Sequence, residues 1–131
     1  AKNFSLLYAA QSAVLAPLYD VLSTAVYPTL TSRMAMKIGS KYKFSEVQAQ
    51  HWEQFAEAVG LSKAQARKRI LALAKSMPST ARELQSDPGR GFTCHGVVEQ
   101  IVTLIEQRCA LTVRRLSAPA ADLEEGTEPC Q

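Results

Sequence analysis

The sequence predicts a mainly α-helical fold that opens with a short β-hairpin at its amino-terminal end. Two short apolar segments, separated by four small or polar residues, lie within the first twenty positions and predict the hairpin. From residue 45 onward, apolar side chains recur at intervals of three and four, which is the period of an amphipathic helix. Helix-start signals and glycine or proline breaks divide this region into successive helices.

The hairpin is predicted from the segments Phe4–Tyr8 and Ala13–Tyr19, with residues 9–12 as the turn. Pro17 lies near the end of the second segment, where a missing N–H donor is tolerated at the edge of a sheet. The apolar stretch Val21–Pro28 follows directly. We expect a short helix there, ended by its proline.

The first long helix is predicted from Ser45 and Gln48, which have the spacing of a capping box. In such a box the hydroxyl accepts the N3 amide, and the N3 side chain reaches back to the N-cap. Gly60 is expected to end this helix, because glycine adopts the left-handed C′ conformation without strain. Before the helix, Met34–Ile38 is expected to be extended and is closed by Gly39.

The second long helix has the same start signal, Ser62 with Gln65, and Pro78 is expected to end it. A short helix over Ser79–Leu84 should follow. The turn-forming run Asp87-Pro88-Gly89 then breaks the chain.

The last helix is predicted over Cys94–Leu116, with Arg114 and Arg115 at the negative pole of its dipole. Residues 118–131 are rich in Pro, Gly, Ala and acidic residues, and they predict a disordered acidic tail. The sequence therefore predicts one folded unit over residues 1–117, followed by that tail.

Composition places few limits on function. The chain has 131 residues, which suits one domain or one lobe of a larger fold. No run approaches the ~18 apolar residues that a membrane span needs, and the first residues do not have the pattern of a signal peptide, so we expect no membrane partner. The first residue is not Met, so we expect a piece of a longer protein. The odd number of cysteines fits a reducing cytoplasm; they are Cys94, Cys109 and Cys130.

The net charge of +3 is unevenly distributed, because the tail holds four of the 12 acidic residues and none of the 15 basic ones. A basic body can bind nucleic acid, and the run Lys63, Arg67, Lys68 and Arg69 could contact DNA phosphates. A solvated helix face explains the same run more simply, and we prefer that interpretation. His51 and His95 have no Cys or His at metal-binding spacing, so we expect ordinary helix residues, with His51 partly buried.

The residues that could carry chemistry are Asn3, just before the first strand, and Asp20, just after the second. A hairpin brings its two ends together, so their side chains should be neighbours. Two hard oxygen ligands suit Mg²⁺, and a catalytic-loop Asn followed by a metal-binding Asp is the arrangement of a kinase metal site. On spacing alone, ordinary turn formation explains both residues better.

The amino-acid sequence of residues 1–20 resembles the HipA family of bacterial kinases. The family pattern is Asp-x-His-x-Lys-Asn-Phe-Ser, a hairpin, and then Leu-x-Pro-x-Tyr-Asp. Residues 1–5, Ala-Lys-Asn-Phe-Ser, are similar to the end of the first part, and residues 15–20, Leu-Ala-Pro-Leu-Tyr-Asp, to the second. Further similarities lie at Tyr27-Pro28, at Met34–Gly39 and around His51-Trp52. The resemblance covers about residues 1–117.

The resemblance implies the helical carboxyl-terminal lobe of a bilobed, protein-kinase-like serine/threonine kinase. By this resemblance Asn3 and Asp20 would bind Mg²⁺, and Lys2 would lie at the edge of the ATP phosphate site. HipA-type kinases are toxins of toxin–antitoxin modules that pair with a small DNA-binding antitoxin, HipB. The family's best-known target is an aminoacyl-tRNA synthetase, glutamyl-tRNA synthetase.

The family's catalytic Asp would precede Ala1, and the glycine-rich ATP loop is also absent, so we expect no phosphoryl transfer by this chain alone. The alternative is a non-catalytic helical module that binds an antitoxin or another protein partner near DNA. Under either interpretation, an exposed apolar patch around Phe4, Leu6, Leu18 and Val21 would favour self-association.

Overall fold

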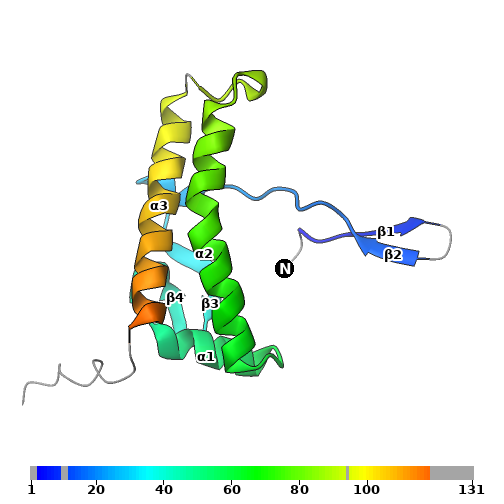
Figure 1. Cartoon of the computed structure of the whole chain (residues 1–131), viewed down its shortest axis with the longest axis vertical. Helices are drawn as coiled ribbons and strands as arrows, with labels where there is room; N and C mark the ends of the chain where they lie inside the picture. The colour runs from blue at the N-terminus through cyan, green and yellow to red at the C-terminus, as the bar shows by residue number, and fades with distance from the viewer. Residues whose placement is uncertain (1–2, 10–11, 94, 119–131) are drawn as a thin grey trace, which may run out of the picture.

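The computed structural model describes residues 3–9, 12–93 and 95–118. A thin hairpin extends away from a pair of long antiparallel helices, and a third helix and a small second sheet pack near one end of that pair (Figure 1). The mainly helical fold with an amino-terminal hairpin is therefore confirmed. The strands are β1 (Leu6–Ala9), β2 (Ser12–Leu15), β3 (Arg33–Ile38) and β4 (Lys41–Lys43), and the α-helices are α1 (Ala49–Ala58), α2 (Lys63–Ser86) and α3 (Gly96–Ser117).

The hairpin forms where the apolar pattern predicts it, although its strands are shorter than expected. β1 and β2 pair antiparallel, with Leu6 opposite Leu15, and the Ala16 amide adds a hydrogen bond of 2.8 Å to the Ser5 carbonyl. Ala10 and Gln11 of the predicted turn lie outside the described residues. The two strands bring the segments before β1 and after β2 together.

The prediction of a helix over Val21–Pro28 is wrong. The structure has an extended chain with one 3₁₀ turn, Thr24–Val26, because a stretch this short cannot recover the cost of helix nucleation. The extended segment at 34–38 is confirmed as β3, which pairs with β4. Gly39 adopts φ +58 in the turn between them, and a Cβ there would lie 2.7 Å from the His51 carbonyl oxygen. This close approach explains the glycine.

The start of α1 differs from the prediction. Ser45 lies in a 3₁₀ turn, Phe44–Glu46, and the helix begins after Gln48. The backbone amide of Gln48 donates a 2.8 Å hydrogen bond to Nδ1 of His51. His51 therefore occupies the N3 position, where a Glu or Gln is usual. His51 is only 4% exposed, so it is buried rather than partly buried. The Ser-x-x-Gln pattern of residues 45–48 does not predict that a histidine side chain caps the start of α1.

The start of α2 is as predicted, because the Gln65 amide donates to Ser62 Oγ at 3.2 Å. The prediction that Pro78 ends this helix is wrong: α2 continues through it to Ser86 and absorbs the short helix predicted at 79–84. Pro78 removes one backbone hydrogen bond at a cost of about 3 kcal/mol, and the long packed surface between α2 and α3 offsets that cost.

The break at residue 87 is confirmed, since Asp87 Oδ1 accepts the Gly89 amide at 2.9 Å. α3 then begins at Gly96 and ends within one residue of the prediction, while Cys94 lies outside the described residues. Arg115 does more than complement the helix dipole, because its guanidinium donates to the carbonyls of Val47 and Ser45. It thereby ties the end of α3 to the segment before α1.

The core lies between the three helices and is built from small and medium side chains. Its buried apolar residues are Val47, Ala56, Ala66, Ala74, Val102, Cys109 and Leu116. Arg82 of α2 joins Glu99 and Glu106 of α3 in a surface network with N–O distances of 2.7 to 2.9 Å. Among the described residues, no helix combines the length and hydropathy needed to cross a membrane. The predicted tail, apart from Ala118, lies outside the described residues.

Candidate functional site

Asn3 and Asp20 lie side by side, as the hairpin argument predicts. Asn3 Nδ2 donates to the Asp20 backbone carbonyl at 3.3 Å and to the carboxylate oxygen Oδ2 at 3.4 Å. Seventeen residues of sequence separate the two, so the contact is a product of the fold and not of a local turn. A turn-forming role of either residue does not by itself require this contact.

The hairpin ladder and one side-chain contact position this pair. The pairing of Leu6 with Leu15 fixes the register, and Ser5 Oγ lies within hydrogen-bond distance, 3.2 Å, of the Tyr19 hydroxyl. Asp20, five residues after β2, adopts φ +53 in the left-handed region. Aspartate enters this region more readily than most residues, and such conformations gather at functional sites.

The donor set fits Mg²⁺. An amide group and a carboxylate stand within 3.4 Å of each other at the solvent-exposed base of the hairpin, and no basic side chain of the described residues forms an ion pair with Asp20. No group of three His, Cys, Asp or Glu that could hold a metal occurs in the described part of the chain. An ion here would therefore complete its shell with water or phosphate oxygens, as Mg²⁺ does in nucleotide sites.

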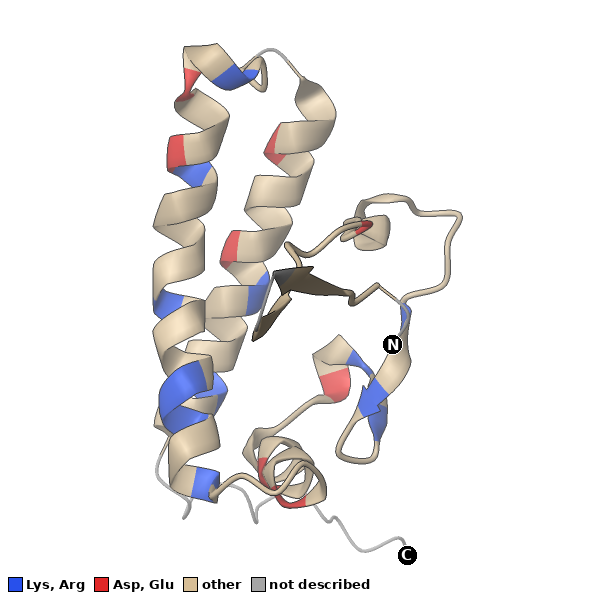
Figure 2. Ribbon diagram, turned by 90° about the vertical axis from the view of Figure 1, so that its right-hand side faces the viewer, with Lys and Arg blue, Asp and Glu red and all other residues tan. Residues whose placement is uncertain are grey.

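The other predicted site residues have different outcomes. Lys2 lies outside the described residues. Within the basic run on α2, Lys63 forms ion pairs with Glu53 and Glu57, and the Arg67 guanidinium donates to the Leu116 carbonyl. Several basic positions gather towards the end of the helix pair where α2 begins and α3 ends (Figure 2). All four bases of the run are exposed to solvent, in agreement with the preferred interpretation of a solvated helix face.

The predicted apolar patch around the hairpin is present. Its four residues are exposed by 57% (Phe4), 53% (Leu6), 60% (Leu18) and 74% (Val21). Large apolar side chains at this density of exposure are unusual on a free soluble surface. Phe4 and Val21 of this patch directly follow Asn3 and Asp20 in the sequence.

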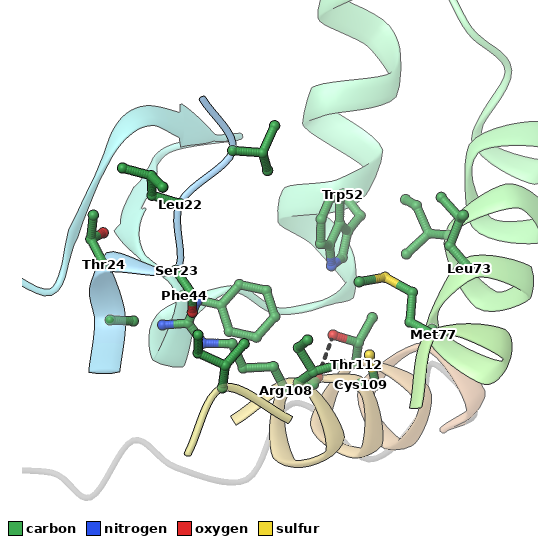
Figure 3. A pocket seen from close by; sticks show the side chains of 16 residues that line it. Leu22, Ser23, Thr24, Phe44, Trp52, Leu73, Met77, Arg108, Cys109 and Thr112 are labelled. Carbon is green, nitrogen blue, oxygen red and sulfur yellow. Dashed lines mark hydrogen bonds between the residues drawn. The ribbon is translucent and has the colours of Figure 1, made fainter. Parts of the chain in front are cut away.

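An apolar groove that the sequence did not predict lies next to this end. It is lined by the segment Val21–Ala25, by Phe44 and Trp52, and by α2 and α3, and it encloses about 670 Å³ (Figure 3). The sequence feature that could have indicated this groove is the wide apolar stripe on α2. Its residues Leu73 and Met77 stay exposed although α2 packs against α3. We call this feature the linker groove.

Comparison with known families decides what this arrangement belongs to. A sequence model described as "HipA-like C-terminal domain" matches residues 1–81, which include the hairpin, β3, β4, α1 and most of α2. The chain belongs to this family. Within the HipA-like domain, the Asn3–Asp20 pair and the hairpin therefore lie in the matched region, whereas α3 lies beyond it.

A relative supports the assignment. The HipA-like chain is 41% identical over 86 residues to a protein named "Putative kinase Y4mE" from Sinorhizobium fredii (strain NBRC 101917 / NGR234). The match covers 66% of this chain but only 20% of Y4mE. No solved structure matches the chain significantly. The matched segment of this HipA-like chain therefore spans about a fifth of that relative's length.

Proposed function

We propose that this chain forms part of the carboxyl-terminal lobe of a HipA-like serine/threonine kinase with a protein-kinase-like fold. In the complete protein, the γ-phosphoryl group of ATP would pass to a serine hydroxyl of a protein substrate. The observation that carries this proposal is the contact between Asn3 and Asp20 across 17 residues. It joins the two residue types that kinases use as metal ligands, inside a segment that belongs to the HipA-like family.

In this proposal the chain's own residues hold and orient the metal-bound nucleotide. Bound Mg²⁺ would supply neutralisation of the phosphate charge. Asp20 would offer a carboxylate oxygen and Asn3 its amide oxygen, while the Asn3 amide nitrogen keeps the Asp20 carboxylate in place. Lys2 would stand at the edge of the phosphates as a second positive charge. The hairpin ladder keeps both ligands at one end of two paired strands.

The isolated chain should not transfer phosphate. Phosphoryl transfer requires a residue that orients the attacking hydroxyl and a loop that covers the phosphates, in addition to the metal ligands. Neither part belongs to the segment that resembles the family motif. We therefore expect the purified 131-residue chain to show no autophosphorylation with labelled ATP. Autophosphorylation would contradict the proposal that the chain supplies only the metal ligands.

The test uses the protein expressed from the complete reading frame that contains this segment. Asp20→Asn keeps the size of the side chain and its tolerance of the left-handed conformation but removes the charge. We expect it to reduce Mg²⁺-dependent phosphorylation by ~100-fold or more, since metal-bound charge is worth several kcal/mol in such transition states. The matched control is Asp87→Asn, the same change in an exposed turn between α2 and α3.

The outcomes separate the two candidate functions. Loss of activity in D20N with normal activity in D87N supports the kinase. Equal activity in D20N and the unchanged protein would end the metal-ligand assignment. Absence of activity in the unchanged protein would favour the alternative, a non-catalytic helical module that binds an antitoxin or another protein near DNA.

The proposed partners follow from the family and not from this chain's geometry. They are a HipB-like antitoxin, through which DNA would be reached indirectly, and a protein substrate such as an aminoacyl-tRNA synthetase, in the cytoplasm. The exposed apolar hairpin would make self-association of the fragment a further expectation. Sedimentation at increasing concentration tests it, and a monomer at high concentration would contradict it.

A further inference from the structure

The linker groove is an apolar depression of about 670 Å³. Its mouth exposes Leu22 by 74%, Leu73 by 60% and Met77 by 45%, and the Trp52 ring forms part of its wall (Figure 3). Burying one such side chain is worth about 1.5–3 kcal/mol. Several exposed together favour an occupant that covers them at once.

The groove also contains a positive charge that has no ion-pair partner among the described residues. Arg108 is the only charged residue among those that line it, and its guanidinium stacks on the Phe44 ring at 5.1 Å from the ring centre. Among the described residues, no carboxylate lies within ion-pair distance of Arg108. The fitting occupant therefore has an apolar face and one acidic group that reaches Arg108.

The position of the groove indicates where the occupant comes from. Its lining begins at Val21, the residue after Asp20, and Asn3 is hydrogen-bonded to Asp20. The first described residue, Asn3, therefore lies beside the residue that precedes the groove lining. The matched segment is only 20% of Y4mE, so most of that relative's length lies outside the match.

We infer that the linker groove receives an amphipathic α-helix from the part of the longer polypeptide that precedes residue 1. The groove runs between a linker and two helices, and a helix with apolar residues on one face is the element that fills such a space. An acidic residue on that helix pairs with Arg108. Docking also holds Val21 and Leu22, and through them the Asp20 backbone. The inference requires the longer polypeptide but not kinase activity.

The experiment compares methionine oxidation by hydrogen peroxide in the 131-residue chain and in the product of the complete reading frame, read residue by residue by mass spectrometry. Met77 lies in the groove, whereas Met36 on β3 is 66% exposed and does not line it. We expect the longer protein to oxidise at Met77 at least ~10-fold more slowly, with Met36 nearly unchanged.

A charge reversal sharpens the result. Arg108→Glu in the longer protein should restore fast Met77 oxidation, whereas Arg90→Glu, in the exposed turn after α2, should leave Met77 protected. D20N should also leave Met77 protected, which separates this inference from the kinase proposal. Equal Met77 rates in the two unchanged proteins would overturn it. So would a reading frame with no residues before Ala1, or protection in the short chain that grows with its concentration, which would indicate a second copy.

Discussion

The hairpin and the helical part of this molecule differ in what they contribute: the hairpin holds the candidate site, and the helices hold the buried core. The hairpin holds the Asn3–Asp20 pair, yet every side chain described on its strands is exposed, including Tyr8 at 82%. The helices bury Ala56, Val102 and Leu116 almost completely and carry no proposed ligand. The candidate site therefore lies where the chain contributes least to its own stability. Segments of this kind usually depend on contacts supplied from elsewhere.

The largest expected effect tests that division directly. Leu116 is 3% exposed between the helices, whereas Leu15 on β2 is 59% exposed. Leu116→Ala should lower the free energy of unfolding by about 2–5 kcal/mol, because it leaves a cavity in the core. Leu15→Ala should cost less than about 0.5 kcal/mol. Urea denaturation followed by circular dichroism measures both, and a hairpin variant as costly as the core variant would refute the comparison.

A substitution in α2 sharpens the account of the helices. Pro78 lies inside α2 without a backbone donor for the preceding turn, so Pro78→Ala should raise the free energy of unfolding by about 1–3 kcal/mol. The control is Pro88→Ala, since Pro88 begins a 3₁₀ turn where no donor is needed and should change stability by less than about 0.5 kcal/mol. A destabilised P78A would mean that the packing of α2 against α3 depends on the proline.

A pH effect of intermediate size should come from the helical part. Burial, followed by the positive charge of Lys41 and then that of Arg115, lowers the pKa of His51 below its ordinary 6.5. The unfolded chain binds a proton at His51 near pH 6.5 and the folded chain resists it. Stability is therefore fully present above that pH and falls as the pH drops from about 7 to 5. Protonation would also remove the lone pair that accepts the Gln48 amide.

Thermal unfolding between those pH values checks this. His51→Gln keeps a side-chain acceptor at the N3 position but cannot titrate, so it should remove most of the acid-side loss. His95→Gln is the control and should keep that loss, because His95 precedes α3 and is exposed. If H51Q and H95Q behave alike, His51 is not the group responsible.

The smallest effect should come from the candidate ligands themselves. Asn3→Ala and D20N should each shift the melting temperature of the 131-residue chain by less than about 2 °C, because the pair is exposed and joins no core residue. The same changes should matter for activity in the longer protein. A large melting shift would show that the hairpin base is structural, and the functional assay would then need reinterpretation.

Sequence reasoning was most successful where the signal was local. Two apolar segments around a short turn placed the hairpin, the Ser62–Gln65 spacing placed the start of α2, and the Asp87-Pro88-Gly89 run placed the break before α3. The neighbourhood of Asn3 and Asp20 followed from the simple geometry of a hairpin. Each of these features depends on residues close in sequence or on one closed turn.

The failures share a different cause. Pro78 normally ends a helix, but α3, which follows a further turn, packs along α2 and stabilises its continuation. Ser45 had a valid capping pattern, but Arg115, 70 residues away, binds its carbonyl while it lies in a 3₁₀ turn, and His51 caps the helix instead. The linker groove also combines five parts of the chain: residues 21–25, the 3₁₀ turn that holds Phe44, α1, α2 and α3. None of these contacts is encoded by spacing along the sequence.

The sequence alone determined which segments form helices and strands in most places, the family of the chain, and the meeting of Asn3 with Asp20. The helices, the strands and the Asn3–Asp20 contact arise from short-range sterics, local hydrogen bonds and the period of apolar side chains. Only the tertiary structure decided the length of α2, the true cap of α1 and the groove beside Trp52. Those features depend on which surfaces are buried against each other, and burial is a property of the whole arrangement.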